Sequence, residues 1–306
     1  MSNMEEYLKK QLQRTGYPLE IEISSILDKK GWVPFNNELF LDETGIEREI
    51  DIHAVRSRVR IGRSTNKSEE TFYTDFNLVI ECKKSADWTW IFFTRPTMVT
   101  CGAHFFFSGQ YLDFLQALTG NTQGLKDRIF SVENSHYDNF RNVASTYTEI
   151  KTSNQMKTNI RTDTRKKEIF EGINQLTGFL NYDMLHRRLF IKEKPKPLVI
   201  VFYFAVIVFD GKLYEAITKE GELELKEQKH ILLHVQRYSK YLGTRLFFSI
   251  DIVKKEYFVN YLEDLEKDMH LIREKISSNR DSLMSYSRKI MKREKVKKLI
   301  VDLLGR

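Results

Sequence analysis

The chain has 306 residues, with 49 Lys and Arg against 42 Asp and Glu, a formal net charge of +7, and 41% hydrophobic residues. This composition excludes a disordered or collagen-like chain and predicts a globular protein with a substantial core. The longest uncharged apolar run, residues 198–209, falls short of the roughly 20 residues that a membrane-spanning helix needs. The first thirty residues lack a signal-peptide core. We therefore expect a soluble, cytoplasmic protein with no membrane partner.

The number of cysteines and the net charge limit which reactive groups and which binding partners the protein can have. The two cysteines, Cys82 and Cys101, exclude a disulfide framework, and the sequence has no Cys/His spacing typical of structural zinc. The reactive groups then have to be carboxylates, lysines or histidines. A pI near 9.1 permits a polyanionic partner such as nucleic acid without requiring one.

The first half of the chain reads as two helices followed by strands. Hydrophobic periodicity predicts helices at residues 4–13 and 19–30, the second ending at Gly31. The predicted strands are residues 33–41, 49–61 and 77–83. The last of them contains the continuous run Leu78-Val79-Ile80, which is typical of a strand covered on both faces. The next 79 residues, 85–163, fit no single pattern, although Trp88, Trp90 and Phe92 alternate as in a strand.

The second half adds one helix and more strands. A helix is predicted at residues 166–182, where Ile169, Ile173, Leu176 and Leu180 follow helical spacing. The apolar run at 198–209 ends in Asp210-Gly211, which predicts a hairpin turn. Further strands are predicted at residues 231–235 and 246–253. We therefore expect residues 1–255 to form one α/β domain, with a central mixed β-sheet flanked by helices.

Residues 256–306 are predicted to form a helical C-terminal extension. Six apolar residues make a narrow seam on its first helix: Phe258, Leu262, Leu265, Met269, Ile272 and Ile276. Ser278 and Asp281 resemble a capping box that starts a second, basic helix. The seam fits docking on the chain's own domain or a homodimer contact. The basic face fits solvation or contact with phosphates.

A carboxylate and a lysine stand at the end of the buried apolar run. Side chains at i and i+2 of a strand point to the same face, so Glu81 and Lys83 project together. Burying two charges costs several kcal/mol unless they pair or bind a metal. The pair therefore fits either a reactive site or a structural ion pair, and it also fits a strand that simply reaches solvent.

Asp51 interrupts an apolar stretch of the strand predicted at 49–61. By itself an Asp in a strand is weak support for any site. Together with Glu81 and Lys83, it supplies two hard oxygen ligands for Mg²⁺ and a lysine for the attacking water. This set is what metal-assisted phosphodiester hydrolysis needs.

Asp51 followed by Glu81-Cys82-Lys83 resembles the active-site signature of the PD-(D/E)xK, or restriction-endonuclease-like, superfamily, and is closer to its Mrr-like branch. That branch has a helix with a glutamate, apolar positions and a closing glycine before the first core strand. The same spacing is found here at Glu20, Ile23, Ile26, Leu27 and Gly31. Residues 18–84 carry the match, and Ile50 stands where the family has a proline.

The resemblance implies a restriction-endonuclease-like core and a metal-dependent phosphodiesterase. By the same resemblance, Asp51, Glu81 and the backbone carbonyl of Cys82 would hold Mg²⁺, with Mn²⁺ as a substitute. Lys83 would orient the nucleophilic water and help to lower its pKa. Glu20 would complete the site from the helix.

Other residues compete for these roles or flank them. Glu22 is the rival of Glu20, although the spacing to Gly31 favours Glu20. Gln175 is a further candidate, because many family members place a glutamine on the helix after the core; the alternative is an exposed polar helix face. Lys84 would point away from Lys83, toward solvent or a phosphate. The cysteine, Cys82, should face the opposite side of the strand and be inert.

The histidines are weaker candidates. His53 shares the face of Asp51, but a hydrogen-bonded histidine in the core or at its rim is the simpler interpretation. His230 and His234 have the spacing of a helical zinc pair, yet the residues between them favour a strand.

We expect a Mg²⁺-dependent nuclease, most simply a DNA endonuclease in a prokaryotic restriction or phage-defence setting. The alternatives are an RNA-directed nuclease, or a nucleic-acid-binding or structural subunit of the same fold that lost the reaction. The intact set of Glu20, Asp51, Glu81 and Lys83 favours the enzyme. Since no separate recognition domain is visible, a partner protein would choose the target.

Overall fold

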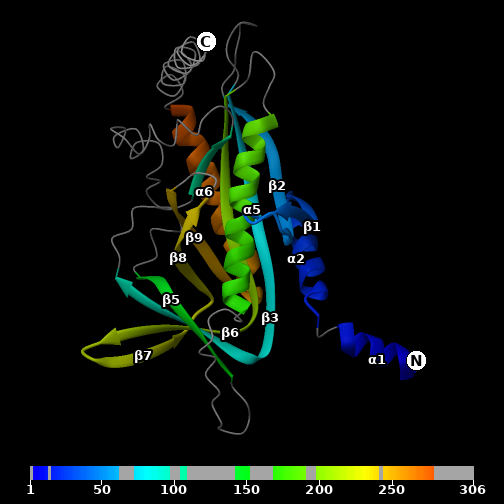
Figure 1. Cartoon of the computed structure of the whole chain (residues 1–306), viewed down its shortest axis with the longest axis vertical. Helices are drawn as coiled ribbons and strands as arrows, with labels where there is room; N and C mark the ends of the chain where they lie inside the picture. The colour runs from blue at the N-terminus through cyan, green and yellow to red at the C-terminus, as the bar shows by residue number, and fades with distance from the viewer. Residues whose placement is uncertain are drawn as a thin grey trace, which may run out of the picture.

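The structure, a computed structural model, describes residues 3–12, 15–61, 72–96, 104–108, 142–151, 168–190, 198–240 and 244–278. A large β-sheet forms the middle of the molecule, and helices cover both of its faces (Figure 1). The helices are α1 (Asn3–Leu12), α2 (Tyr17–Lys29), α5 (Glu168–Phe190) and α6 (Phe258–Ser278). Within these ranges no helix has the length and apolar character needed to span a bilayer.

The nine-stranded sheet is mixed, with strand order β1-β2-β3-β5-β8-β9-β6-β4, and β7 pairs with β6. Its strands are β1 (Val33–Leu41), β2 (Glu47–Ile61), β3 (Phe72–Pro96), β4 (His104–Ser108), β5 (Asn142–Lys151), β6 (Leu198–Lys219), β7 (Glu222–Glu227), β8 (His230–Ser239) and β9 (Thr244–Lys254). A single 3₁₀ turn, Lys255–Tyr257, joins β9 to α6. This architecture confirms the predicted α/β class with a central mixed sheet flanked by helices.

The centre of the sheet is the parallel pair of β3 and β6, on which the site depends. Their backbones pair over most of their length, with Glu81 of β3 opposite Ile207 of β6. Residues 76–82 and 201–209 are buried throughout, as expected of strands that are covered on both faces. On the other side of β3, the antiparallel β2 pairs with it, and β1 forms the edge.

Each face of the sheet has its own hydrophobic cluster. On one face α5 packs against the sheet through Ile169, Ile173, Leu176, Phe179 and Leu180. On the other face, α2 and α6 share one cluster with Leu78, Ile80 and Cys82 of β3. Because successive residues of a strand point to opposite faces, Glu81 and Lys83 point toward α5, while Cys82 points toward α2 and α6.

The end of α2 explains why the predicted helix stops at Gly31. The N–H of Trp32 donates to the carbonyl of Leu27 and the N–H of Gly31 donates to that of Asp28, which is a Schellman motif. Gly31 has φ +78°, a conformation that favours glycine. Trp32 is buried after the turn, so the cap directs the chain into β1.

The apolar seam of the C-terminal extension lies in the core of its own domain. All six seam residues of α6 belong to the cluster that also contains α2. The predicted second helix and its basic face lie outside the described residues. Of the two interpretations of the seam, the structure shows docking on its own domain; a homodimer through the C-terminal helices and a phosphate contact of the basic face stay predictions.

Two expectations about strand ends are wrong. β3 does not end at Lys83 but runs on to Pro96, because Trp90 and Phe92 are buried in the hydrophobic cluster under α5. Asp210-Gly211 is not a hairpin turn, since β6 continues through both residues. The turn comes at Glu220-Gly221, where both residues have positive φ and join β6 to β7, as a two-residue hairpin requires.

Gly211 is needed because the backbone of β3 passes close to it. A Cβ there would lie 2.8 Å from the carbonyl oxygen of Ser85 and would overlap the ring of Phe209, which stacks on Trp90 with centroids 3.8 Å apart. Between Lys84 and Thr89 the register of the β3–β6 pair shifts, so the two strands bend together here. The Asp-Gly pair thus marks a close approach of two strands.

We expect Gly211→Ala to lower the free energy of unfolding by about 1–3 kcal/mol, because overpacking at a backbone contact cannot relax cheaply. Urea denaturation monitored by circular dichroism would measure the loss. Lys212→Ala, at the exposed neighbouring position, is the control and should change stability by less than about 0.5 kcal/mol. Equal stability of Gly211→Ala and the unmodified protein would contradict this account.

Candidate active site

Asp51, Glu81 and Lys83 meet where β2 and β3 pair beneath α5. Ile52 is paired with Ile80, so Asp51 lies beside Glu81 across the ladder. The backbone N–H of Cys82 donates to Oδ2 of Asp51 at 2.7 Å. Lys83 Nζ lies 2.5 Å from Oε2 of Glu81 and 3.9 Å from Oδ2 of Asp51. The structure thus brings together the three residues that carry the predicted motif.

Burial sets the electrostatics of this cluster. The side chain of Glu81 is fully buried and those of Asp51 and Lys83 are 14% and 18% exposed. Burial raises the pKa of Glu81 to about 8 despite the charge of Lys83, and it also raises the pKa of Asp51. Burial opposes the charge on Lys83, but Glu81 and Asp51 outweigh it and raise the lysine pKa. A protonated lysine is therefore held between two acids.

Glu20 of α2 lies near this cluster, and Glu22 does not. Burial, followed by the charges of Asp51 and Glu49, raises the pKa of Glu20 to about 7. Gly16 leaves room for it, since a Cβ there would lie 3.1 Å from Oε1 of Glu20. Glu22 is exposed and pairs with Lys255 at 2.7 Å. The spacing argument that favoured Glu20 over its rival therefore agrees with their positions.

Gln175 of α5 contacts the cluster from the other side. Its Oε1 accepts from Nζ of Lys83 at 3.5 Å, and its Nε2 donates to the backbone carbonyl of Glu49 at 3.2 Å. The helix can approach because Gly172, one turn earlier, has no side chain. A Cβ there would lie 3.2 Å from Cδ1 of Ile207 and in ordinary contact with Cε of Lys83, at 3.4 Å. The alternative of an exposed, uninvolved polar face does not apply to Gln175.

The remaining candidates lie apart from the cluster or have structural partners. Lys84 is exposed and lies 3.8 Å from Asp210. The thiol of Cys82 is buried on the opposite face of the sheet, in the hydrophobic cluster under α2 and α6. Burial raises its pKa well above the usual value. His53 is buried, with Nδ1 2.7 Å from Glu38 and Nε2 3.0 Å from Asn77. It is the hydrogen-bonded core histidine that the simpler interpretation predicted.

Of the two histidines on β8, His230 has structural partners, whereas Nε2 of His234 is buried without a hydrogen-bond partner among the described residues. Both residues lie in a strand, as predicted, and that strand pairs with β9. His230 Nε2 lies 2.8 Å from Oδ1 of Asp251, whose other oxygen accepts from the hydroxyl of Tyr261. This network ties β8, β9 and α6 together.

Sequence reasoning missed two residues that border the site. Asn37 of β1 donates to the carboxylate of Glu49, and its hydrogen bond to Glu20 lowers the pKa of that acid. Asn37 has φ +56°, a conformation that asparagine tolerates better than most residues. The charge of Glu49 raises the pKa values of both Glu20 and Asp51. The Asn-Asn pair inside the predicted strand 33–41 was the available signal for Asn37.

One buried oxygen in the cluster lacks a partner. Oε1 of Glu81 is buried with no hydrogen-bond partner among the described residues, although such atoms are normally satisfied. A divalent cation would satisfy it, and two acids beside a lysine suit a hard cation. Within the described ranges, no three His, Cys, Asp or Glu side chains group as metal ligands. A cation at this point would have two carboxylates and a main-chain oxygen as its protein ligands.

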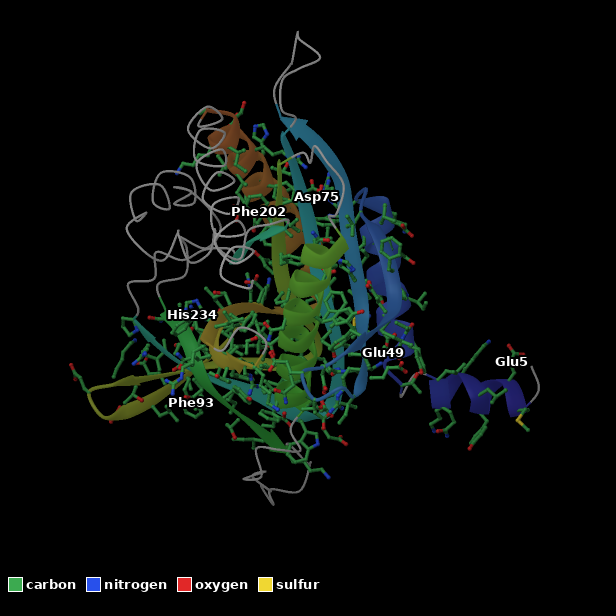
Figure 2. The ribbon with its side chains drawn as sticks, turned by 45° about the horizontal axis from the view of Figure 1, so that its top comes forward. Glu5, Glu49, Asp75, Phe93, Phe202 and His234 are labelled. Carbon is green, nitrogen blue, oxygen red and sulfur yellow. The ribbon has the colours of Figure 1, made fainter. Side chains whose placement is uncertain are left out.

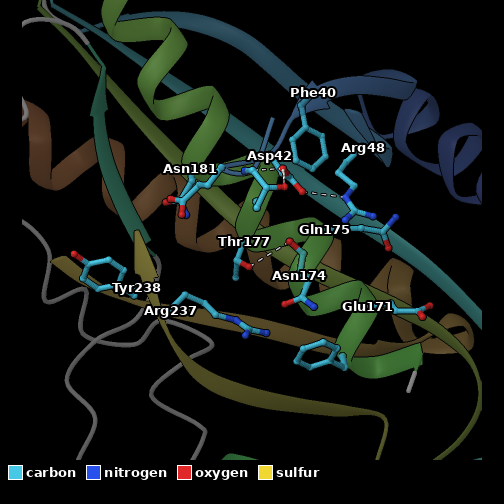
Figure 3. A pocket seen from close by; sticks show the side chains of 14 residues that line it. Phe40, Asp42, Arg48, Glu171, Asn174, Gln175, Thr177, Asn181, Arg237 and Tyr238 are labelled. Carbon is cyan, nitrogen blue, oxygen red and sulfur yellow. Dashed lines mark hydrogen bonds and ion pairs between the residues drawn. The ribbon is translucent and has the colours of Figure 1, made fainter. Parts of the chain in front are cut away.

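A cavity of about 560 Å³ adjoins the site on the α5 side. It lies between α5, the β1–β2 turn and the end of β8 (Figure 3). Gln175 lines it as well as contacting Lys83. Glu49 of β2, labelled in Figure 2, accepts a hydrogen bond from Gln175 through its backbone carbonyl. The cavity and the acidic cluster therefore share one wall.

Comparisons with known proteins do not identify a family. The chain matches no family model, no curated protein and no solved structure. The function therefore has to be argued from the site.

Proposed function

We propose that the protein is a Mg²⁺-dependent nuclease that hydrolyses phosphodiester bonds, acting as a DNA endonuclease. One observation carries the proposal. Nζ of Lys83 lies 2.5 Å from Glu81 on its own strand and 3.9 Å from Asp51 on the neighbouring strand. Two acids and a lysine around one point are the groups that metal-assisted hydrolysis uses.

The finer fold assignment is part of the same proposal. The antiparallel strands β1, β2 and β3, followed by a parallel partner β6, support a restriction-endonuclease-like core. The motif residues stand on β2 and β3, and α2 precedes them as the resemblance implies. The helix α5 packs over the same face and contributes Gln175.

The roles follow from position and charge. Asp51, Glu81 and the carbonyl of Cys82 would hold Mg²⁺, which would stabilise charge on the phosphate and activate a water. Lys83, kept protonated by the two acids, would hold the attacking water by donating a hydrogen bond. Gln175 restrains the lysine from α5. Glu20, with its pKa near 7, would accept a proton or support the cation.

The direct test is to incubate the purified protein with plasmid, linear DNA, single-stranded DNA and RNA. Each substrate is tested in Mg²⁺, Mn²⁺ and EDTA. We expect cleavage of DNA in either metal and none in EDTA. Cleavage of RNA alone would favour the RNA-directed alternative. Binding without cleavage in any metal would favour a subunit that has lost the reaction.

Glu20 and Glu22 form a matched pair for testing the site's boundary. We expect Glu20→Gln to reduce cleavage about tenfold or more, because a positioned acid contributes on that scale or above. Glu22→Gln should leave cleavage unchanged, since Glu22 pairs with Lys255 on the surface. Initial rates on a DNA substrate, with melting temperatures as a folding check, would measure both. A larger loss in Glu22→Gln would remove Glu20 from the site.

A further inference from the structure

The cavity beside α5 contains a cation that has no counter-ion among the described residues. Arg237 of β8 lines it, with its guanidinium carbon 5.2 Å from the ring centre of Phe170. Nε of Arg237 is buried and lacks a hydrogen-bond partner in the described part of the chain. Burial lowers the pKa of this arginine. Stacking fixes the guanidinium of this cavity-lining arginine, and its buried Nε has no acceptor among the described residues.

The acids of the β1–β2 turn are already engaged. Asp42 lies 3.1 Å from Arg48 and accepts hydrogen bonds from its own turn. Glu43 accepts from the hydroxyl of Ser239 and from the backbone N–H of Lys240. Across the cavity in Figure 3, Arg237 stands opposite Asp42 and Arg48. Arg237 is therefore available to a ligand anion rather than to these carboxylates.

A second polar atom in the cavity wall also lacks a partner. Asn181 of α5 is 6% exposed, and its Oδ1 is buried with no hydrogen-bond partner among the described residues. An unsatisfied buried acceptor is unfavourable, so a ligand N–H or O–H that bonds to it would be favourable. The cavity wall thus has a donor for a ligand anion, the guanidinium of Arg237, and an acceptor for the polar edge of a ligand ring, Oδ1 of Asn181.

The rest of the wall suits a flat ring. Phe40, Phe170 and Tyr238 line the cavity together with the amides of Asn174 and Gln175. Aromatic side chains provide stacking surfaces for nucleobases, and amides read their polar edges. A volume of about 560 Å³ lies within the range of small-molecule sites.

We infer that this cavity binds a single nucleotide, with its phosphate on Arg237 and the polar edge of its base toward Asn181. Two sources share this chemistry: a free mononucleotide, and one nucleotide of a nucleic-acid strand. The strand source rests on the proposed nuclease function, because Gln175 joins the cavity to Lys83. A nucleotide held here would position the strand beside the scissile phosphate.

Calorimetry in EDTA tests the inference without any cleavage. The probes are the four deoxynucleoside 5′-monophosphates, the corresponding nucleosides and inorganic phosphate. We expect at least one monophosphate to bind more tightly than its nucleoside and than phosphate. Arg237→Met and Asn181→Leu should each weaken the binding of that monophosphate about tenfold or more. Arg245→Met is the control, because Arg245 is exposed on β9 and pairs with Tyr238 in the ladder without lining the cavity.

Three results would overturn the inference: no binding of any monophosphate at millimolar concentration, phosphate binding as tightly as the nucleotides, or equal losses in Arg237→Met and Arg245→Met. Melting temperatures show whether each variant is folded, and Asn174→Ala replaces any variant that is not. Displacement of the bound monophosphate by single-stranded DNA would indicate the strand as the source, and failure to displace it would indicate the free nucleotide. Nucleotide binding in EDTA without cleavage in Mg²⁺ would refute the nuclease proposal and leave this inference standing.

Discussion

Replacing Lys83 with alanine is expected to lower Mg²⁺-dependent cleavage about a hundredfold or more, the scale on which a positioned proton donor contributes. The ammonium group lies between Glu81 and Asp51 at 2.5 and 3.9 Å, where it would hold the attacking water. Asp51→Ala should cause a loss of similar size, because it removes one of the two cation ligands. Initial rates of plasmid cleavage at saturating Mg²⁺ would measure both variants.

Lys84→Ala is the matched control, since this lysine is the adjacent residue and lies 3.8 Å from Asp210 on the opposite side of the strand. Its cleavage rate should stay within about threefold of the unmodified protein, as expected for a surface change. Both lysine variants should bind DNA in EDTA with similar affinity. Cleavage at the normal rate by a folded Lys83→Ala protein would refute the proposed site.

Strong local patterns made much of the fold predictable. The cap at Gly31 and the apolar face of α2 predicted that helix to within two residues. The predicted strand 33–41 coincides with β1. The seam of α6 was visible from its spacing, because each of its six residues packs on the sheet. Capping residues and hydrophobic periodicity mark where these elements begin and end.

Long strands were less predictable because their ends depend on partners. β6 passes through Asp210-Gly211 because β3 pairs with it before and after this point, up to Asp210 and again from Lys212, whereas β9 pairs with it only up to Phe209. An Asp-Gly pair carries the same local preference whether the chain turns or two backbones come close. The same holds for β3, whose second half pairs with β5, a strand that no sequence pattern predicted.

The motif residues of the site were predictable, while its border was not. Glu81 and Lys83 share a face by parity alone, and the register of β2 adds Asp51. Gln175 joins them through the packing of α5 on the sheet, where Gly172 lies against Ile207 and Lys83. Asn37 and Glu49 reach Glu20 across tertiary contacts. Such positions depend on packing between distant segments, which local periodicity does not encode.

Glu81→Gln is expected to separate the two roles of this acid, ligand and buried charge. The variant should lose Mg²⁺ binding measured by calorimetry, because a neutral amide replaces a charged ligand whose Oε1 has no other partner among the described residues. Glu222→Gln, on the exposed strand β7, is the control and should bind Mg²⁺ as the unmodified protein does. Unchanged Mg²⁺ binding in Glu81→Gln would place the cation elsewhere.

The same variant should change how stability depends on pH in EDTA. The pKa of Glu81 is about 8 in the folded protein against 4.5 for the ordinary carboxyl. Between these values the folded state holds a proton that the unfolded state has released, so this group's stabilisation is complete below pH 4.5 and is lost as the pH rises through 8. From pH 5 to pH 8 the unmodified protein should therefore lose roughly 3–4 kcal/mol more unfolding free energy than Glu81→Gln. Urea denaturation of both proteins at four pH values measures the difference, and the shifts of Glu20 and Asp51 affect both proteins in the same direction. Parallel pH profiles would mean that Glu81 stays ionised in the folded protein and that Lys83 outweighs its burial.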